Sequence, residues 1–353
     1  MIATGAFSAW LGSAENATWQ VPSIVLVAGA FCSRLLRGVP LKSLAWLAVT
    51  VIGLQRLRRR DAHPGEGDDA GGLVVVTMRV VRGPEELEEA LAAAAREASA
   101  AFGDGTVFCE RYVERPRHVE IQLLADTHGN VLALGERDCS VQRRHQKVLE
   151  ESPSPALDTV LNPGLRAEMS EAAVAFARAI GYVSAGTAEF MLDGRDHWFL
   201  ELNGRIQVEH PVTELVTGRD LIRDQIRIAE GEPLEPSNSL LQGHAVEVRL
   251  YAEDPRTFLP QAGTIGRLRL PAGVRVDAGV EEGDEIGLAY DPMIAKLVAH
   301  GPTRAEALAR LGDALAETEV GGVTTNLPFL RWLVAHPVLR AGEATTSFLT
   351  EHP

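Results

Sequence analysis

Cysteine is scarce in this sequence, and no long apolar run is present. The three cysteines are odd in number and far apart, so the sequence predicts neither a disulfide framework nor a zinc site. The apolar runs 21–31 and 43–54 are each shorter than the ~20 residues that a membrane span needs. We therefore expect a protein of the reducing cytoplasm that does not span a membrane.

An excess of positive charge is also lacking. The chain has 48 acidic against 34 basic residues, and its net charge of -14 argues against a general nucleic-acid binder. Its 353 residues, 46% of them hydrophobic, are ordinary for a globular protein with two or three domains and are enough to bury real cores.

The first 72 residues differ in pattern from the remainder. Residues 1–20 carry no lysine or arginine, which argues against a secretory signal. Residues 61–72 are rich in glycine and aspartate and are typical of a linker. We expect 1–72 to be an atypical N-terminal segment that ends in this linker.

From Leu73 onward, strand and helix patterns mix without a strict βαβ rhythm, which predicts an α+β fold. The expected strands are 74–81, 107–113, 118–125, 131–134, 244–254, 264–270 and 274–279. The expected helices are 84–102, 165–180, 211–229, 303–318 and 326–335.

The stretch 199–214 has the most unusual polar pattern in the chain. With a period of two, one face is apolar and the other carries an acid, an amide, a guanidinium, an amide and an acid: Glu201, Asn203, Arg205, Gln207 and Glu209. These groups are sufficient to hold a metal ion and an anion together. A half-exposed strand without a ligand is the alternative reading.

The residues just upstream favour a ligand site. Residues 186–192 alternate in the same way, and the turn 193–196 predicts a β-hairpin that sets Glu189 opposite Glu201. Facing carboxylates about 5 Å apart repel unless a cation lies between them. With Asn203 nearby, these hard oxygen ligands suit Mg²⁺ or Mn²⁺, and a nucleotide triphosphate would complete the metal's shell.

Four long motifs, taken in order, resemble one known family. The segments 110–120, 136–147, 201–211 and 244–254 are similar to the biotin carboxylase component of biotin-dependent, acyl-CoA type carboxylases in the ATP-grasp superfamily. The resemblance runs from about Met78 to the C-terminus. It implies an ATP-grasp domain over 73–235, incomplete on its N-terminal side, and a biotin carboxylase C-terminal domain over 240–351.

The resemblance also implies how the nucleotide is held. Glu189, Glu201 and Asn203 would hold Mg²⁺ or Mn²⁺ on ATP. The residues that would contact the nucleotide come from three segments: Glu110 and Val113 at the adenine, His118 near the ribose, and Gln142, His145 and Lys147 at the phosphates or the bicarbonate side.

The same family would use the polar stretch for chemistry. Arg205, Gln207 and the backbone of Val208 would hold bicarbonate, since a guanidinium matches a planar anion. Glu209 would be the general base that lets bicarbonate attack the γ-phosphoryl group and form carboxyphosphate. Arg249 would stabilise the enolate-like oxygen of biotin.

Several of these residues also have plainer readings. Without the resemblance, the charged run that contains His145 and Lys147 would be interpreted as a solvated face. Arg249 in an alternating strand is equally unremarkable by itself. Cys139 is better explained as a small packed residue than as a nucleophile.

The sequence departs from the family before Met78. A glycine-rich loop is expected there, but this chain has Gly71–Thr77 with three consecutive valines, and its only lysines are Lys42, Lys147 and Lys296. Valines cannot present the open backbone amides of a glycine loop, so we expect weakened nucleotide binding. Because valine codons of the form GTG read as glycine in another frame, we offer a frameshift just before Met78 as a hypothesis.

The expected activity is ATP-dependent carboxylation of biotin with bicarbonate, the first half-reaction of an acyl-CoA carboxylase. Its expected partners are a biotin carboxyl carrier protein or domain, a carboxyltransferase subunit and a second copy of the chain. The alternatives are a non-catalytic remnant that acts as a scaffold in a carboxylase complex, and another ATP-grasp carboxylate ligase.

Overall fold

The structure is a computed structural model that describes residues 47–51, 77–143, 146–157, 160, 162–235 and 241–353. The valine run before Thr77 and the predicted linker lie outside these residues. The chain divides into two compact units, an N-terminal unit of residues 1–113 and a C-terminal unit of residues 114–353. The domain limits expected near 72 and 235–240 stay a prediction.

The N-terminal unit contains a three-stranded antiparallel sheet and one long helix. Its strands are β1 (Leu47–Val51), β2 (Thr77–Val81) and β3 (Phe108–Arg111), with β1 in the middle. Helix α3 (Pro84–Phe102) begins with proline in its first turn and ends at Gly103, whose φ of 74° is left-handed. The helix predicted over 84–102 is therefore confirmed.

The C-terminal unit is built on an eight-stranded sheet with the order β12-β14-β9-β6-β5-β4-β7-β8, and every pair is antiparallel. The strands are β4 (Arg117–Ala125), β5 (Val131–Arg143), β6 (Gln146–Ser152), β7 (Ser184–Asp193), β8 (Asp196–Asn203), β9 (His244–Tyr251), β12 (Arg275–Ala278) and β14 (Met293–Gly301). Two small ladders pair β10 (Gly263–Thr264) with β13 (Glu285–Ile286), and β11 (Arg267–Arg269) with β15 (Glu319–Gly321).

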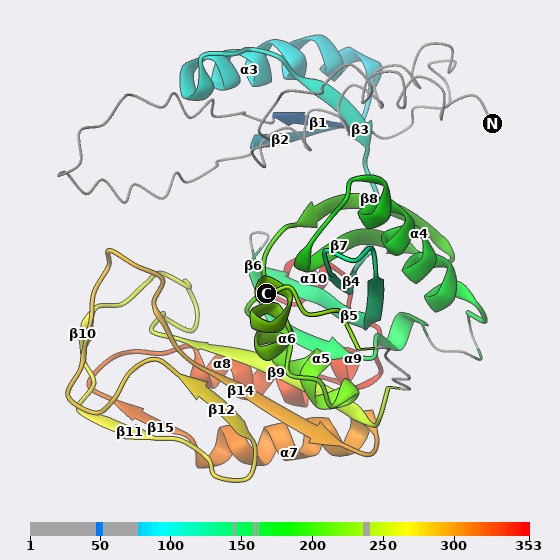
Figure 1. Cartoon of the computed structure of the whole chain (residues 1–353). Coiled ribbons are helices and arrows are strands. Elements are labelled where there is room, and N and C mark those ends of the chain that lie inside the picture. Colours follow the sequence, from blue (N-terminus) through cyan, green and yellow to red (C-terminus); the bar gives the residue numbers. More distant parts are fainter. Residues whose placement is uncertain (1–46, 52–76, 144–145, 158–159, 161, 236–240) are drawn as a thin grey trace, which may run out of the picture. The chain divides into compact units, whose positions relative to one another are not determined.

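Helices pack against the sheet and complete its hydrophobic cores (Figure 1). The helices are η2 (Pro155–Leu157), α4 (Leu165–Ala179), α5 (His210–Thr217), α6 (Leu221–Ala229), α7 (Arg304–Glu317), α8 (Leu327–Ala335), α9 (Pro337–Arg340) and α10 (Phe348–Glu351). Helix α4 packs on β4 and β5, whereas α7 and α8 pack on β9. Helices and antiparallel strands thus form the predicted α+β architecture. No helix in the described ranges is long and apolar enough to cross a membrane.

Two expected elements are divided in the structure. The helix predicted over 211–229 is wrong as a single element, because Gly218 (φ 70°) ends α5 and Asp220 caps a new helix by accepting from the Arg223 N–H. The strand predicted over 264–270 is also two short strands, β10 and β11, which pair with different partners.

The charged run 136–147 is not a solvated face. Strand β5 continues from its apolar start at Val131 to Arg143, and both Glu136 and Arg137 are fully buried. Buried charges persist only where oppositely charged groups and hydrogen bonds compensate them. The solvated interpretation of this run is therefore wrong for the residues that the structure describes, and the compensating groups form the candidate site.

Candidate functional site

The hairpin of β7 and β8 carries a pair of facing carboxylates. The ladder pairs Glu189 with Glu201, which confirms the predicted register. Asn203 Nδ2 donates to Glu189 Oε1 (2.9 Å) and to Glu201 Oε1 (3.2 Å), so both carboxylates converge on one atom. Two carboxylates with an amide group beside them are a ligand set that fits Mg²⁺ or Mn²⁺, which would bind through oxygen atoms and replace the amide N–H contacts.

The predicted alternation through Glu209 is wrong beyond Asn203. The ladder shifts register so that Phe190 faces Phe199, which leaves Leu200 as an extra residue with 41% of its surface exposed. Strand β8 then ends at Asn203, and Glu209 is the residue before α5 rather than part of a strand. Glu209 therefore reaches the sheet through a turn that follows β8, and not as part of an extended strand.

The turn separates two residues that were expected to act together. Gln207 is buried, and its Nε2 donates to Glu189 Oε1 (2.9 Å). Arg205 is exposed, and its Nη1 donates to the carbonyl of Ile206 (3.2 Å). Val208 is half-buried, and Lys296 Nζ donates to its carbonyl oxygen (2.7 Å).

Glu189 lies among four donors. Besides Asn203 and Gln207, it accepts from His118 Nε2 (3.0 Å) and Lys147 Nζ (3.1 Å). Burial alone would raise the pKa of Glu189, but the hydrogen bonds and charges of His118 and Lys147 outweigh it and hold this pKa well below its usual value. Glu189 is therefore ionised at neutral pH.

Its partner Glu201 has a different environment. Partial desolvation by neighbouring atoms, and then the charge of Glu189, raise the pKa of Glu201. The residue still keeps solvent contact at the edge of the sheet. A cation placed between the two carboxylates would remove the repulsion that raises this pKa.

Lys147 is the central cation of the site. Its ammonium contacts Glu120 Oε2 (2.5 Å), Glu189 Oε1 (3.1 Å) and Glu209 Oε1 (2.6 Å). Burial would lower the pKa of Lys147, but Glu120 and the neighbouring acids raise it above its usual value. This lysine therefore stays charged and ties the metal-side carboxylate Glu189 to Glu209.

Glu209 is held between two cations. Its side chain is 2% exposed, and its second oxygen, Oε2, accepts from Arg249 Nη2 (3.1 Å). The same Arg249 atom contacts Glu150 Oε1 (2.5 Å). Glu209 lies at the start of α5, so helix and strands together fix the position of its carboxylate.

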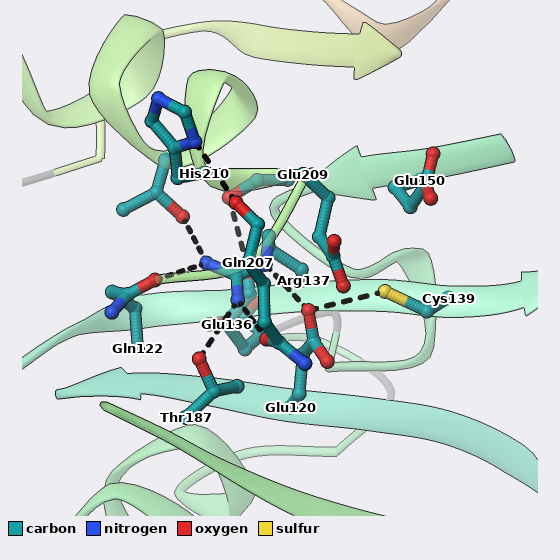
Figure 2. A network of polar contacts seen from close by, with 12 residues as sticks. Glu120, Gln122, Glu136, Arg137, Cys139, Glu150, Thr187, Gln207, Glu209 and His210 are labelled. Atoms are coloured by element: carbon teal, nitrogen blue, oxygen red, sulfur yellow. Dashed lines mark hydrogen bonds and ion pairs between the residues drawn. The ribbon is translucent and has the colours of Figure 1, made fainter. Parts of the chain in front are cut away.

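Arg137 is a structural centre that sequence reasoning did not assign. Figure 2 shows its guanidinium surrounded by side chains from several strands and from α5. The guanidinium is fully buried, and it donates to Glu120 (2.5 Å), Gln122 (2.6 Å), Thr213 (2.9 Å), Thr187 (3.2 Å) and Gln207 (2.9 Å). The sequence feature that could have indicated this buried arginine is the run of alternating charges that directly continues an apolar strand.

The remaining candidates for nucleotide binding lie in different parts of the chain. Gln142 Nε2 hydrogen-bonds His118 Nδ1 and the Cys139 carbonyl (2.9 Å), so these residues form one cluster. His145 lies outside the described residues. Glu110 on β3, whose side chain is also outside them, and Val113 belong to the N-terminal unit, and their role at the adenine stays a prediction.

Comparisons with protein families match most of the chain. Residues 69–237 match the family described as "Carbamoyl-phosphate synthase L chain, ATP binding domain", and residues 247–351 match "Biotin carboxylase C-terminal domain". The biotin carboxylase of Halalkalibacterium halodurans is 48% identical over 301 residues, which are 84% of this chain and 66% of that protein. The propionyl-CoA carboxylase alpha chain of Ruegeria pomeroyi is 48% identical over 300 residues, which are 78% of this chain and 44% of that one.

Solved structures give the same result. The biotin carboxylase domain dimer of the Hydrogenobacter thermophilus 2-oxoglutarate carboxylase, in complex with MgADP, ADP and bicarbonate, is 40% identical with a TM-score of 0.76 and covers 88% of this chain and 66% of its own. The Campylobacter jejuni biotin carboxylase in a β-γ-ATP complex is 42% identical with a TM-score of 0.73, covering 78% and 62%. This chain thus spans just under two thirds, or less, of these relatives, and it belongs to the biotin carboxylase family of the ATP-grasp superfamily.

Proposed function

We propose that this chain carries the site for ATP-dependent carboxylation of biotin with bicarbonate, the first half-reaction of a biotin-dependent, acyl-CoA type carboxylase. The observation that carries the proposal is the buried Glu209 carboxylate, held by Lys147 (2.6 Å) and Arg249 (3.1 Å) within the same cluster as the Glu189–Glu201 pair. Such a carboxylate, fixed next to a metal–phosphate site, is suited to remove a proton from a small acid.

The metal ion would be held by Glu189, Glu201 and Asn203, whose side chains converge. A bound Mg²⁺ or Mn²⁺ supplies charge stabilisation on the phosphate oxygens of ATP. His118, on the neighbouring strand β4, supports the metal site by fixing the Glu189 carboxylate, and Gln142 in turn hydrogen-bonds His118. The family resemblance implies that His145, Glu110 and Val113 would also contact the nucleotide.

The bicarbonate side would be built from the 205–209 turn. The Val208 N–H and the Arg205 guanidinium would bind the anion, while Gln207 is fixed by Arg137 and Glu189 and shapes the turn. Glu209 accepts the bicarbonate proton, and the resulting anion attacks the γ-phosphorus of ATP, breaking its bond to the β–γ bridging oxygen to give carboxyphosphate and ADP. Lys147 and Arg249 stabilise the negative charge around this centre, and Arg249 would later stabilise the enolate-like oxygen of biotin.

The relatives support the ligands and partners of this proposal. The Hydrogenobacter domain is described as a dimer in complex with MgADP and bicarbonate, and other relatives are alpha chains of acyl-CoA carboxylases. By this similarity the chain would act in the cytoplasm as a homodimer with a biotin carboxyl carrier and a carboxyltransferase subunit. Biotin would be the substrate presented by the carrier.

The direct test is ADP release by the purified chain, measured with and without bicarbonate and free biotin. Bicarbonate-dependent release that biotin stimulates would support the proposal, and Glu209→Gln should suppress it. Release that depends on another carboxylic acid instead of bicarbonate would favour a different ATP-grasp ligase.

A second candidate function rests on the sequence before Met78. There the three valines of 74–76 replace the expected glycine-rich phosphate loop. A chain that binds a carboxylase subunit but releases no ADP under any of these conditions would be a non-catalytic scaffold.

A further inference from the structure

A second pair of glutamates faces across the centre of the same sheet. Glu150 on β6 is paired with Glu247 on β9, and both side chains are 0% exposed. Two carboxylates opposite one another in an antiparallel ladder are destabilising when both are charged, and burial increases the cost. The repulsion between the two carboxylates must therefore be offset by hydrogen bonds, by a cation or by a bound proton.

Hydrogen bonds do not provide the compensation. None of the four carboxylate oxygens accepts a hydrogen bond of regular geometry from any residue in the described ranges. Figure 2 draws Glu150 without a dashed line to the network around Arg137. The one ion-pair contact recorded for the pair joins Glu150 Oε1 to Arg249 Nη2 (2.5 Å).

The nearby cations are shared with other acids. Arg249 Nη2 also contacts Glu209 (3.1 Å), so one guanidinium is shared by two carboxylates. Lys147 is divided among Glu120, Glu189 and Glu209. Lys296, which faces Arg249 across the β9–β14 ladder, contacts Asp277 (3.3 Å). Within the described cluster, too little positive charge is left to balance two ionised carboxylates at 150 and 247.

The titratable groups around the pair come from every strand and helix packed on it. They are Cys139 on β5, Lys147 on β6, Glu209 at the start of α5, Arg249 and Tyr251 on β9, and Lys296 on β14. Burial raises the pKa of Glu150 to about 7, with Glu209 adding to the rise and Arg249 opposing it. Burial, and then the charge of Glu150, raise the pKa of Glu247 well above its usual value.

We propose that Glu150 and Glu247 share one proton, carried mainly by Glu247, and that the pair positions Arg249 beside Glu209. Glu150 then bears the negative charge that holds the guanidinium, while the neutral Glu247 fills the opposite position without repelling it. The second half of this inference rests on the proposed function, because it assigns the pair to the site of that reaction.

The geometry gives the two glutamates unequal roles. Glu150 contacts Arg249 directly, whereas no contact between Glu247 and a cation is recorded in the described residues. Glu247→Gln replaces a neutral carboxylic acid by a neutral amide of similar shape. Glu150→Gln instead removes the counter-charge of Arg249 and leaves Glu209 as its remaining ion-pair partner in the described cluster.

Infrared spectroscopy of the full chain tests proton sharing without any enzymatic activity. At pH 8, above the pKa of about 7 of Glu150, the chain should still show the carbonyl stretch of a protonated, buried carboxylic acid, and Glu247→Gln should remove this band. The matched control is Glu317→Gln, since Glu317 is exposed at the end of α7 and should contribute no such band. Absence of the band in the parent chain, or its persistence in Glu247→Gln, would overturn the proposal.

Positioning of Arg249 is tested by nuclear magnetic resonance and by kinetics. With ¹⁵N-labelled arginine, Glu150→Gln should shift the Arg249 Nε resonance more than Glu247→Gln does. In bicarbonate-dependent ATP cleavage, Glu150→Gln should lower kcat by about tenfold or more with KM for ATP little changed, a size typical of coupling between contacting residues. Glu247→Gln, which replaces one neutral side chain by another, should have the smaller effect on kcat.

The outcomes separate this inference from the proposed function. If the infrared band behaves as expected but the parent chain cleaves no ATP, the proposed reaction fails and the proton-sharing pair stands. Equal effects of both glutamine variants on the Arg249 resonance would overturn the positioning role. Should Glu150→Gln not fold, the infrared band and the Arg249 resonance of Glu247→Gln still decide the question: the band should be lost and the resonance should be little changed.

Discussion

Two glutamate pairs in one sheet answer the same electrostatic problem in different ways. Glu189 and Glu201 face each other at the edge formed by β7 and β8, where Asn203 donates to both and solvent reaches Glu201. Glu150 and Glu247 face each other between β6 and β9, where both are fully buried without regular hydrogen bonds in the described residues. The pair Glu189–Glu201, here called the edge pair, can bind a metal ion, whereas the pair Glu150–Glu247, here called the dry pair, can lower its repulsion only by binding a proton.

The difference follows from access and from donors. A divalent cation needs a path and several oxygen ligands, and the edge of the sheet supplies both. A buried pair without donors cannot keep two charges, because desolvation outweighs a single shared guanidinium. The position in the sheet, rather than the residue type, therefore decides what a facing pair of glutamates does.

The largest expected effect comes from removing the charge of the edge pair. Glu201→Gln should abolish metal-dependent ATP turnover, because one carboxylate and an amide no longer balance a divalent cation. ADP release at several Mg²⁺ concentrations measures this. Full turnover at ordinary metal concentrations would contradict the assignment of Glu201 as a ligand.

The next effect concerns the carboxylate that lies between the two pairs. Residues 1–77 replaced by the matching part of an active biotin carboxylase should give a chimera with activity, since the edge pair, the 205–209 turn and Glu209 all lie downstream. In that chimera, Glu209→Gln should lower the rate by roughly 10²–10⁴, the usual contribution of a general base, with ATP binding little changed. Carboxybiotin formation and ATP affinity are the two measurements.

This chimera also tests the frameshift hypothesis from the protein side. A chimera that folds and binds ATP but makes no carboxybiotin would indicate that the downstream residues are themselves inactive. The scaffold function would then be the better explanation. Sequencing the locus upstream of Met78 for a glycine-loop reading frame provides an independent check.

The edge pair could be predicted from the sequence, and the dry pair could not. The hairpin signal around 193–196 fixes a register, and a register places Glu189 opposite Glu201 without further knowledge. Glu150 and Glu247 are 97 positions apart and meet only because β6 and β9 pair in the finished sheet. No local pattern contains that information.

Two predictions from the sequence were wrong for identifiable physical reasons: the length of the strand that ends at Asn203 and the exposure of the charged run before Lys147. The period-two pattern continues through Glu209, but the chain leaves the sheet at Asn203 and the polar groups of Gln207 and Glu209 return through a turn. The charged run before Lys147 was ambiguous because charge favours solvent unless a buried partner exists. That partner, the network around Arg137, comes from residues far away in the sequence.

A smaller effect distinguishes the dry pair by its pH dependence. The pKa of Glu150 rises from 4.5 to about 7 on folding. Between about pH 4.5 and pH 7, Glu150 therefore holds a proton in the folded chain but not in the unfolded chain. This contribution to stability is present below about pH 4.5 and is lost as pH rises through about 7, by an amount on the order of 3 kcal/mol. Glu150→Gln should remove that part of the decline.

The measurement is urea unfolding of the parent chain and of Glu150→Gln at pH 5 and pH 8. The difference in unfolding free energy between the two proteins should change with pH, with the parent losing more stability at pH 8. Glu317→Gln, which changes an exposed glutamate, should leave the parent's pH dependence intact. An identical pH dependence in Glu150→Gln and the parent would mean that Glu150 does not titrate in this range.

The smallest effect is expected at the edge pair in the absence of metal. Glu201→Gln relieves the repulsion from Glu189, which raises the pKa of Glu201, and it removes no buried apolar contact. Favourable cross-strand pairs are worth roughly 0.2–1 kcal/mol, and like charges directly opposite each other are destabilising, so the metal-free variant should be as stable as the parent or more stable by up to about 1 kcal/mol. Urea unfolding in the presence of a chelator measures the difference, and added Mg²⁺ should stabilise the parent more than the variant. A clear loss of metal-free stability would show that Glu201 has a structural partner, and the contrast between a metal-recruiting edge pair and a proton-sharing central pair would then have to be abandoned.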